Sequence, residues 1–216
     1  MASSPTDIRT LDTEGLKDVA VQLGQPAFRG KQIAEWLWTK GASRFEDMTN
    51  LPQAFRASLA AEYLLSPIRA EEEQVSRDGT VKCAFPIETG KVVEGVLIPA
   101  KERMTACISS QVGCSLSCAF CATGKLKLMR NLTAGEIVDQ VRHIAELAER
   151  HHDHRLTNIV YMGMGEPLLN YRNVLESVDR ITGTPGLGMS PKRITVSTAG
   201  ISKMIRKLGD DEVRFN

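Results

Sequence analysis

Residues 104–121 of the chain are Met-Thr-Ala-Cys-Ile-Ser-Ser-Gln-Val-Gly-Cys-Ser-Leu-Ser-Cys-Ala-Phe-Cys, and this stretch decides the fold of the second half. We assign its first seven residues, 104–110, to a strand, and a cysteine-rich loop follows directly. Beyond it, strand and helix patterns alternate to residue 209. Such alternation predicts right-handed βαβ units and a parallel sheet with a ligand site at the carboxyl ends of its strands.

The elements of this α/β half are defined by apolar spacing and by one capping signal. Thr133-x-x-Glu136 is a capping box that opens the first helix. Further strands are predicted at 159–162 and 193–197. The apolar faces of the three helices comprise Ile137, Val141, Ile144 and Ala148, then Val174, Val178 and Ile181, then Ile201, Met204, Ile205 and Leu208.

Two other regions precede the α/β half. Residues 1–66 form a small helical domain, with short helical patterns that start at a Thr13 cap, continue through 33–37, and end in a segment 52–65 capped by Asn50. Residues 67–103 form a β-rich connecting segment, in which 81–85 and 92–98 predict antiparallel strands between turns at Asp78-Gly79 and Thr89-Gly90. The third region, 104–216, is the α/β half.

Composition and charge exclude several classes of protein. The chain has 216 residues, 42% of them hydrophobic and 25% charged, which is an ordinary globular balance. Its 27 Lys and Arg nearly cancel its 26 Asp and Glu, so any polyanion site must be a local patch. No apolar run approaches a membrane span and the N-terminus resembles no signal peptide, so we expect a cytoplasmic protein without membrane contact.

The cysteines indicate where chemistry takes place. There are five, an odd number, and Cys107, Cys114, Cys118 and Cys121 fall within fifteen residues, with Cys83 upstream. Clustered thiols in a cytoplasmic chain more often bind metal or react than form a disulfide framework.

The spacing of the last three cysteines is C-x₃-C-x₂-C, which is compatible with three kinds of explanation. Three thiolates on an iron–sulfur cubane leave one iron open for a substrate or cofactor. A structural zinc site wants four ligands, and all four histidines lie more than twenty residues away, on or beyond a helix. The third explanation is chance spacing.

The motif C-x₃-C-x-Phe-C resembles the signature of radical S-adenosylmethionine enzymes. Further motifs narrow the resemblance to the adenine C2 methyltransferases of 23S ribosomal RNA and transfer RNA, the RlmN and Cfr family. These motifs are residues 107–114 (Cys-Ile-Ser-Ser-Gln-Val-Gly-Cys), 121–124 (Cys-Ala-Thr-Gly), 162–167 (Met-Gly-Met-Gly-Glu-Pro) and 195–200 (Thr-Val-Ser-Thr-Ala-Gly). The resemblance covers nearly the whole chain and implies a partial (βα)₆-type barrel, of which the first three βα units are present.

The resemblance implies a [4Fe-4S] cluster on Cys114, Cys118 and Cys121, which chelates S-adenosylmethionine and cleaves it to a 5′-deoxyadenosyl radical. It also implies that Gly165 and Glu166 bind S-adenosylmethionine, the carboxylate receiving the ammonium group. On its own this segment is more often an ordinary tight βα turn, because glycine-rich turns are common. Ser197 matches a third cofactor-binding position, although an isolated Ser there is more often a helix cap.

Two residues outside the cluster motif match catalytic positions of the family. Glu94 matches the proton acceptor, whereas strand alternation alone places it on the solvent side of a half-buried strand. Cys107 matches the thiol that breaks the covalent link between enzyme and RNA, whereas on its own it is a small buried apolar residue.

The implied partners are 23S rRNA, tRNA and an electron donor for the cluster, with a monomeric full-length protein. Residues 1–66 then correspond to the family's RNA-binding accessory domain. Lys125, Lys127, Arg130 and the acid-free stretch 192–207 can meet phosphates, but solvated loop and helix faces explain them equally well. The run 151–154, His-His-Asp-His, lacks further ligands and is interpreted as a polar helix end.

The chain departs from the family pattern after Cys121. The family's mechanism needs a methyl-carrying cysteine near the C-terminus, and no cysteine follows Cys121. Three βα units also cannot close a barrel, and residues 213–216 resemble the start of a fourth strand. We therefore expect a truncated methyltransferase without methyl transfer if these residues are the whole polypeptide. The alternatives are a radical enzyme acting on a non-RNA substrate and a non-catalytic metal-binding module.

Overall fold

The computed structural model describes residues 5–87 and 90–216, and the chain divides into two compact units. The first unit comprises Met1–Pro67 together with Arg180–Gly188, and the second comprises Ile68–Asp179 and Met189–Asn216. The turn expected at Thr89 lies partly outside the described residues.

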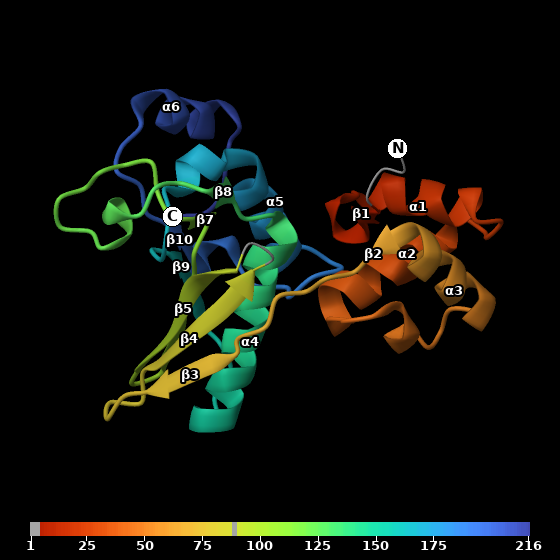
Figure 1. Cartoon of the computed structure of the whole chain (residues 1–216), viewed down its shortest axis with the longest axis horizontal. Helices are drawn as coiled ribbons and strands as arrows, with labels where there is room; N and C mark the ends of the chain where they lie inside the picture. The colour runs from red at the N-terminus through yellow and green to blue at the C-terminus, as the bar shows by residue number, and fades with distance from the viewer. Residues whose placement is uncertain (1–4, 88–89) are drawn as a thin grey trace. The chain divides into compact units, whose positions relative to one another are not determined.

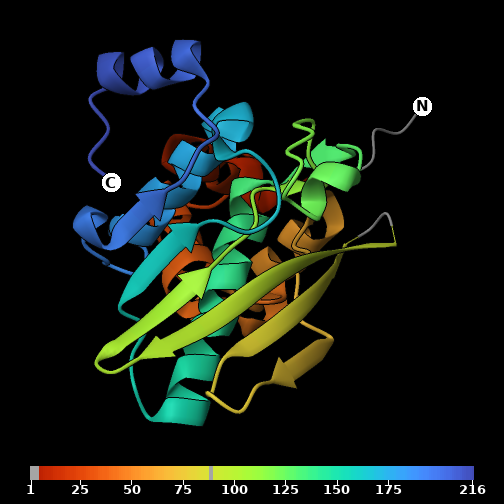
Figure 2. The same ribbon diagram turned by 90° about the vertical axis from the view of Figure 1, so that its left-hand side faces the viewer.

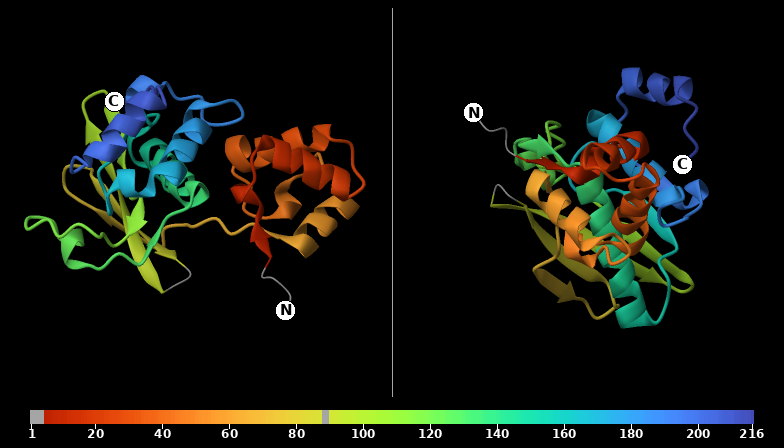
Figure 3. Two further views of the ribbon diagram at one scale, coloured as in Figure 1. Left: turned by 90° about the horizontal axis from the view of Figure 1, so that it is seen from above. Right: turned by 90° about the vertical axis from the view of Figure 1, so that its right-hand side faces the viewer.

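The first unit is helical, as expected, and its core is apolar. Large buried side chains from its helices, including Leu16, Ile33, Trp38 and Phe55, form that core. The segment 180–188 joins this unit through Arg180, whose guanidinium lies 4.7 Å from the centre of the Trp38 ring. Its main elements are β1 (Thr6–Asp7), α1 (Thr13–Gln22), α2 (Phe28–Glu35), a π-helical turn (Trp36–Lys40), α3 (Gln53–Glu62) and β2 (Tyr63–Leu64), with β1 and β2 parallel (Figures 1 and 3).

Two expected caps of this unit are wrong. Asp12 caps α1, because its side chain accepts a hydrogen bond from the Gly15 N–H, and Thr13 is the first helical residue. Asn50 does not cap α3, which begins after Pro52. Instead the Asn50 side-chain oxygen accepts a hydrogen bond from the Trp36 indole.

The second unit is built on a six-stranded sheet in the order β10-β9-β6-β5-β4-β3. The strands β6, β9 and β10 are parallel, as the alternation predicted, and β3 to β6 are antiparallel neighbours. A separate antiparallel pair, β7 with β8, lies at the ends of the cysteine loop. The strands are β3 (Glu72–Val75), β4 (Val81–Ile87), β5 (Lys91–Ala100), β6 (Arg103–Cys107), β7 (Gln111–Val112), β8 (Arg130–Asn131), β9 (Asn158–Tyr161) and β10 (Ile194–Val196).

Helix α4 (Ala134–His152) covers one face of this sheet (Figure 2). Its predicted apolar face is buried, and the approach to the sheet is so close that a Cβ on Gly95 of β5 would lie 3.0 Å from Ile144. The helix starts with the expected capping box, since the side chains of Thr133 and Glu136 each accept a hydrogen bond from the other's backbone N–H. Arg130 of β8 pairs with both oxygens of Glu136, so the end of the cysteine loop is fixed to the helix start.

The other α-helices of the second unit, within the described residues, are α5 (Tyr171–Thr182) and α6 (Ser202–Asp210). At the β10 edge, the backbone of Asn216 hydrogen bonds to Ile194 and Val196, so the last residue continues the ladder where a further strand was expected. The sheet is open, and the predicted partial α/β barrel preceded by a helical region and an antiparallel stretch is confirmed. Among the described residues, no helix combines the length and the apolar character needed to cross a bilayer.

Gly30 generates a prediction about the helical unit. A Cβ at this position would lie 2.5 Å from the backbone N of Lys17, because α1 and α2 pack backbone to backbone there. We expect Gly30→Ala to destabilise this unit by about 1–3 kcal/mol through overpacking. Gly15→Ala is the matched control, since its nearest new neighbour is an Asp12 side-chain oxygen at 3.3 Å. Urea unfolding followed by the fluorescence of Trp36 and Trp38, both in this unit, measures the difference; equal stability of the two variants would contradict it.

Candidate cofactor and active site

The site is organised around five residues, 108–112, that connect β6 to the cysteine loop. Three consecutive polar side chains in this segment, Ser109, Ser110 and Gln111, are at most 1% exposed. Buried polar groups are stable only when they are hydrogen bonded, and the partners of these three residues lie on β5, α4, β8 and the turn after β9.

Ser109 connects the segment to the sheet, to α4 and to the turn after β9. Its hydroxyl donates to the backbone oxygen of Glu94 (2.6 Å) and accepts from the Met164 N–H (2.8 Å). Its backbone is held by Gln140 of α4, whose side chain bonds to both the N–H (2.9 Å) and the carbonyl (3.1 Å) of Ser109. One buried Ser therefore fixes three neighbouring elements relative to one another.

The turn after β9, residues 162–166, packs directly against this segment. A Cβ on Gly163 would lie 2.7 Å from the Ile108 carbonyl oxygen, so only glycine permits the approach. Gly165 has a positive φ of 98°, and a Cβ there would lie 2.5 Å from the Cβ of Gln111. Close contact with residues 108–111 thus requires glycine at both positions of this turn.

Glu166 ends the turn, and this residue is 3% exposed. One oxygen accepts from the backbone N–H of Leu168 (3.0 Å) and the other from that of Ala199 (2.8 Å). The carboxylate therefore links the loop after β9 to the loop after β10. Each oxygen retains a second lone pair that can accept an ammonium group.

The three motif cysteines lie on one loop, residues 113–129, whose ends are joined by the β7–β8 pair (Figure 1). All three are free and partly exposed, and Phe120 between them is 94% exposed. The loop is closed at its neck, since a Cβ on Gly113, whose φ is 75°, would lie 2.2 Å from the Lys127 carbonyl oxygen. Within it, the Cys121 N–H donates to the Cys118 carbonyl (3.1 Å).

This donor set fits an iron–sulfur cubane better than a single metal ion. Within residues 5–87 and 90–216, no three His, Cys, Asp or Glu side chains converge closely enough to hold one ion, and this includes the histidine run at 151–154. In a cubane each thiolate binds a different iron, so the sulfurs need not converge on one point. Thiolate is the ligating form of cysteine, and hydrogen bonds from the Gly124 and Thr123 backbone lower the pKa of the Cys121 thiol.

Glu94 and Cys107 lie on the sheet face opposite α4. Cys107 pairs directly with Val96 of β5, and Glu94 is two residues along the same strand, so all three side chains share this face. Glu94 is half exposed, and its carboxylate forms an ion pair with Lys82 at 2.6 Å. Burial raises the pKa of the Cys107 thiol, and a hydrogen bond from the Met162 backbone partly opposes this shift.

Ser197 follows the last residue of β10 and is exposed, two residues before the Ala199 amide that Glu166 binds. It is not a helix cap, because α6 begins at Ser202 after Ile201. The structure thus brings Gly165, Glu166 and Ser197 to the carboxyl ends of the parallel strands, where the cysteine loop also begins. Glu94 and Cys107 lie on the adjoining open sheet face.

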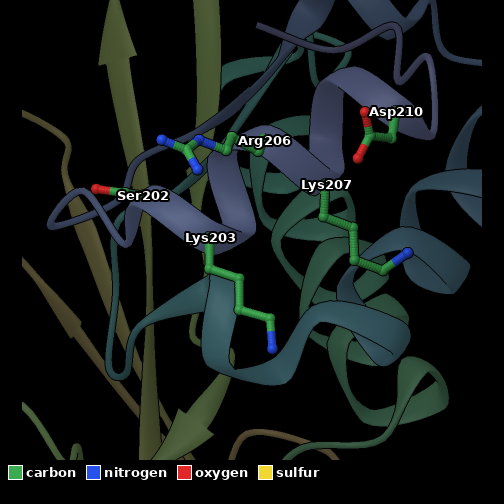
Figure 4. A pocket seen from close by; sticks show the side chains of 5 residues that line it. All are labelled: Ser202, Lys203, Arg206, Lys207 and Asp210. Carbon is green, nitrogen blue, oxygen red and sulfur yellow. The ribbon is translucent and has the colours of Figure 1, made fainter.

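The basic stretch 192–207 is only partly brought together. Ser202, Lys203, Arg206, Lys207 and Asp210 of α6 line a shallow cavity of about 440 Å³ (Figure 4). Lys207 is neutralised there by Asp211 at 2.9 Å. This cavity contains none of the predicted cofactor residues, and a polar helix face explains it as well as a phosphate site does.

The sequence interpretation missed Ser109, Ser110, Gln111 and Gln140 as parts of the site. A signal was available for the first three, because three polar residues directly follow an apolar strand and directly precede the cysteine loop. Polar residues at such a position are either solvated or engaged in supporting hydrogen bonds. For Gln140 no local signal existed, since it lies on a helix face among apolar residues.

An open α/β sheet with a three-thiol loop at the carboxyl ends of its parallel strands defines a cofactor-binding protein of the iron–sulfur class. Comparison with known proteins narrows this class. Residues 108–216 match the Radical SAM superfamily, and residues 6–65 match the ribosomal RNA large subunit methyltransferase N-terminal domain. The chain belongs to the radical SAM superfamily, and this membership implies a [4Fe-4S] cluster and S-adenosylmethionine as cofactors.

Individual relatives are consistent with this assignment. The chain is 54% identical over 209 residues to a probable dual-specificity RNA methyltransferase RlmN of Flavobacterium johnsoniae. The matched region covers 97% of this chain and 60% of the relative. It is 56% identical over 208 residues to a protein of the same description from Cytophaga hutchinsonii, with 96% and 57% covered. A crystal structure of a radical SAM methyltransferase from Sphaerobacter thermophilus matches with a TM-score of 0.87 and 38% identity, over 98% of this chain and 62% of that one. The chain thus spans about 60% of the length of these relatives.

The two hydrogen bonds of Glu166 predict a specific weakness. In Glu166→Gln one acceptor oxygen becomes an NH₂ group that faces a backbone N–H, of either Leu168 or Ala199. We expect a loss of about 1.5–3 kcal/mol in unfolding free energy, the usual size for a buried bond to a charged acceptor. Chemical denaturation measures it, and amide hydrogen exchange should accelerate at Leu168 or Ala199. Glu94→Gln is the control, because its half-exposed ion pair contributes at most about 1 kcal/mol; an equal effect in both variants would disprove the assignment.

Proposed function

We propose that the chain is the cofactor-binding part of a radical SAM RNA methyltransferase that modifies C2 of adenine in 23S rRNA and tRNA. The observation that carries this proposal is the shared support of the site. The three-thiol loop and the Gly165–Glu166 turn both attach to the buried residues 108–112, beside the sheet face that presents Glu94 and Cys107.

On the cofactor side, we assign Cys114, Cys118 and Cys121 to the cluster. When bound and reduced, such a cluster supplies the electron that cleaves S-adenosylmethionine homolytically. We assign Gly165, Glu166 and Ser197 to S-adenosylmethionine. Gly165 keeps the backbone free of a side chain at the turn, and the Glu166 carboxylate supplies negative charge for an ammonium group while holding the Ala199 amide in place.

On the substrate side, we assign Glu94 as the proton acceptor and Cys107 as the thiol that resolves the enzyme–RNA link. The Glu94 carboxylate is accessible, and Lys82 holds it at a fixed place on the open sheet face. Burial raises the pKa of the Cys107 thiol, and the hydrogen bond from the Met162 backbone N–H partly opposes this rise. The family resemblance also implies a methyl-carrying cysteine near the C-terminus, and no cysteine follows Cys121 in this sequence.

For the macromolecular partners, the match of residues 6–65 supports residues 1–66 as an RNA-binding accessory domain. We further propose that residues 67–103 connect it to the radical SAM core in 104–216. A cytoplasmic location, a monomeric full-length protein and a separate electron donor complete the proposal. The proposed RNA substrate is supported by the relatives, which are described as probable dual-specificity RNA methyltransferases.

The cluster assignment is tested by anaerobic reconstitution with iron and sulfide. We expect the wild-type chain to bind about four irons and to give the electron paramagnetic resonance signal of a reduced cubane, because three thiolates suffice to hold one. Alanine at Cys114, Cys118 or Cys121 should abolish the signal. Cys83→Ala is the control, because Cys83 is fully buried in β4 outside the loop. Retention of the signal in Cys114→Ala, or one zinc without iron in the wild type, would reject the assignment.

The substrate is tested in cells that lack the gene. Mass spectrometry of nucleosides from purified 23S rRNA and tRNA should show that 2-methyladenosine is lost from one or both RNAs, because the proposed reaction is methylation at C2 of adenine. Re-expression of the complete gene is the control and should restore the nucleoside. Unaltered 2-methyladenosine in both RNAs would favour a radical enzyme with a non-RNA substrate.

A further inference from the structure

Gln111 lies between the cysteine loop and the turn after β9, and its side chain bonds to both. Its Nε2 donates to the side-chain oxygen of Asn131 (2.7 Å), and its Oε1 accepts from the backbone N–H of Glu166 (2.8 Å). The residue has no exposed surface. A buried amide in this position has one donor end and one acceptor end, and both are used.

The Asn131 end of this bridge fixes the cysteine loop. Gln111 and Asn131 are paired residues of β7 and β8, the two strands that enclose residues 113–129. The same pair of strands is closed by the Met129 N–H, which donates to the Val112 carbonyl (2.9 Å). The side-chain bond between Gln111 and Asn131 therefore ties together the two ends of the segment that carries all three motif cysteines.

The Glu166 end fixes the turn. The stem of Gln111 occupies the space that a side chain on Gly165 would need, with a separation of 2.5 Å to the Cβ position. The bonded N–H belongs to Glu166, whose carboxylate in turn holds the Ala199 amide after β10. A continuous series of bonds thus runs from Asn131 through Gln111 and Glu166 to Ala199.

We propose that Gln111 is a positioning residue that sets the separation between the three-cysteine loop and the Gly165–Glu166 turn. This inference rests on the proposed function, in which the loop holds the cluster and the turn holds S-adenosylmethionine. A ligand that must contact both is sensitive to their spacing, because a shift of about 1 Å between groups that act together can lower activity a hundredfold. Only a side chain with the length of Gln and an amide end makes both bonds; Glu lacks the donor, and Met has the length without either bond.

The principal test compares Gln111→Met with Tyr161→Phe. The control also removes a buried hydrogen bond from the same unit, between the Tyr161 hydroxyl and Ser177 (2.7 Å), and leaves the series of bonds from Asn131 to Ala199 intact. We expect both variants to bind iron like the wild type. Equilibrium dialysis should show S-adenosylmethionine binding weakened about tenfold or more only in Gln111→Met, because the buried Glu166 N–H loses its acceptor and the exposed Asn131 side chain loses its donor. The change that S-adenosylmethionine produces in the paramagnetic resonance signal should be incomplete in that variant even at saturation.

Hydrogen exchange of the cluster-free protein tests the coupling without cofactors. In Gln111→Met we expect faster exchange at the amides of Met129, Glu166 and Ala199, which lie on three different segments. Tyr161→Phe should leave these amides unchanged. If Gln111→Met does not fold, Asn131→Ala opens the bridge from its exposed end and should change the same amides and the same affinity in the same direction.

Three results would overturn the proposal. One is wild-type S-adenosylmethionine affinity and spectral response in Gln111→Met, another is equal weakening in Tyr161→Phe, and the third is unchanged exchange at all three amides. Failure of the proposed function itself has a different signature. In that case the wild type binds no cluster, or its paramagnetic resonance signal does not change when S-adenosylmethionine is added. The proposal about cofactor spacing then fails as well. The hydrogen exchange experiment still decides whether Gln111 couples the two segments.

Discussion

The rest of this site depends on the hydrogen bonding of three buried polar residues, Ser109, Ser110 and Gln111. A buried polar group without a partner costs roughly 1–3 kcal/mol, so a run of three is stable only where the surrounding backbone supplies partners in fixed positions. Here those partners come from β5, α4, β8 and the turn after β9. The need to satisfy the polar groups thus specifies where the cysteine loop and the turn lie.

Strand alternation determines which chemistry faces which side of the sheet. On one face, the apolar residues of β4, β5 and β6 pack against α4, and this burial drives folding. The intervening residues, which include Glu94 and Cys107, are left on the other face. A one-residue shift in register would exchange the two sets and bury the carboxylate. The reactive face therefore exists because the opposite face is strongly apolar.

Much of the fold could be predicted from the sequence, because apolar periodicity and caps are local signals. The three parallel strands, the α4 capping box and the antiparallel stretch are all present, with boundaries shifted by up to three residues. The strand β3 was missed, since Glu72–Val75 is exposed throughout and shows no alternation. The site was predicted as a set of motif residues, whose assigned roles stay predictions. What the sequence could not show is the support from Gln140 and Asn131. Gln140 lies 31 residues from its partner Ser109, and Asn131 lies 20 residues from Gln111, so neither pair leaves a local pattern in the sequence.

The thiols show how one residue type acquires separate properties from its surroundings. Cys83 is fully buried in β4, and burial raises its pKa to about 12, so it remains a neutral packing residue. Cys107 is buried less completely, and its raised pKa is opposed by a backbone N–H. Cys121 is on the loop, where backbone N–H groups lower its pKa toward the thiolate that metals bind. Desolvation and amide hydrogen bonds thus act in opposite directions on the pKa of these thiols, so the surroundings of each cysteine, and not the residue type alone, decide how readily it forms the thiolate.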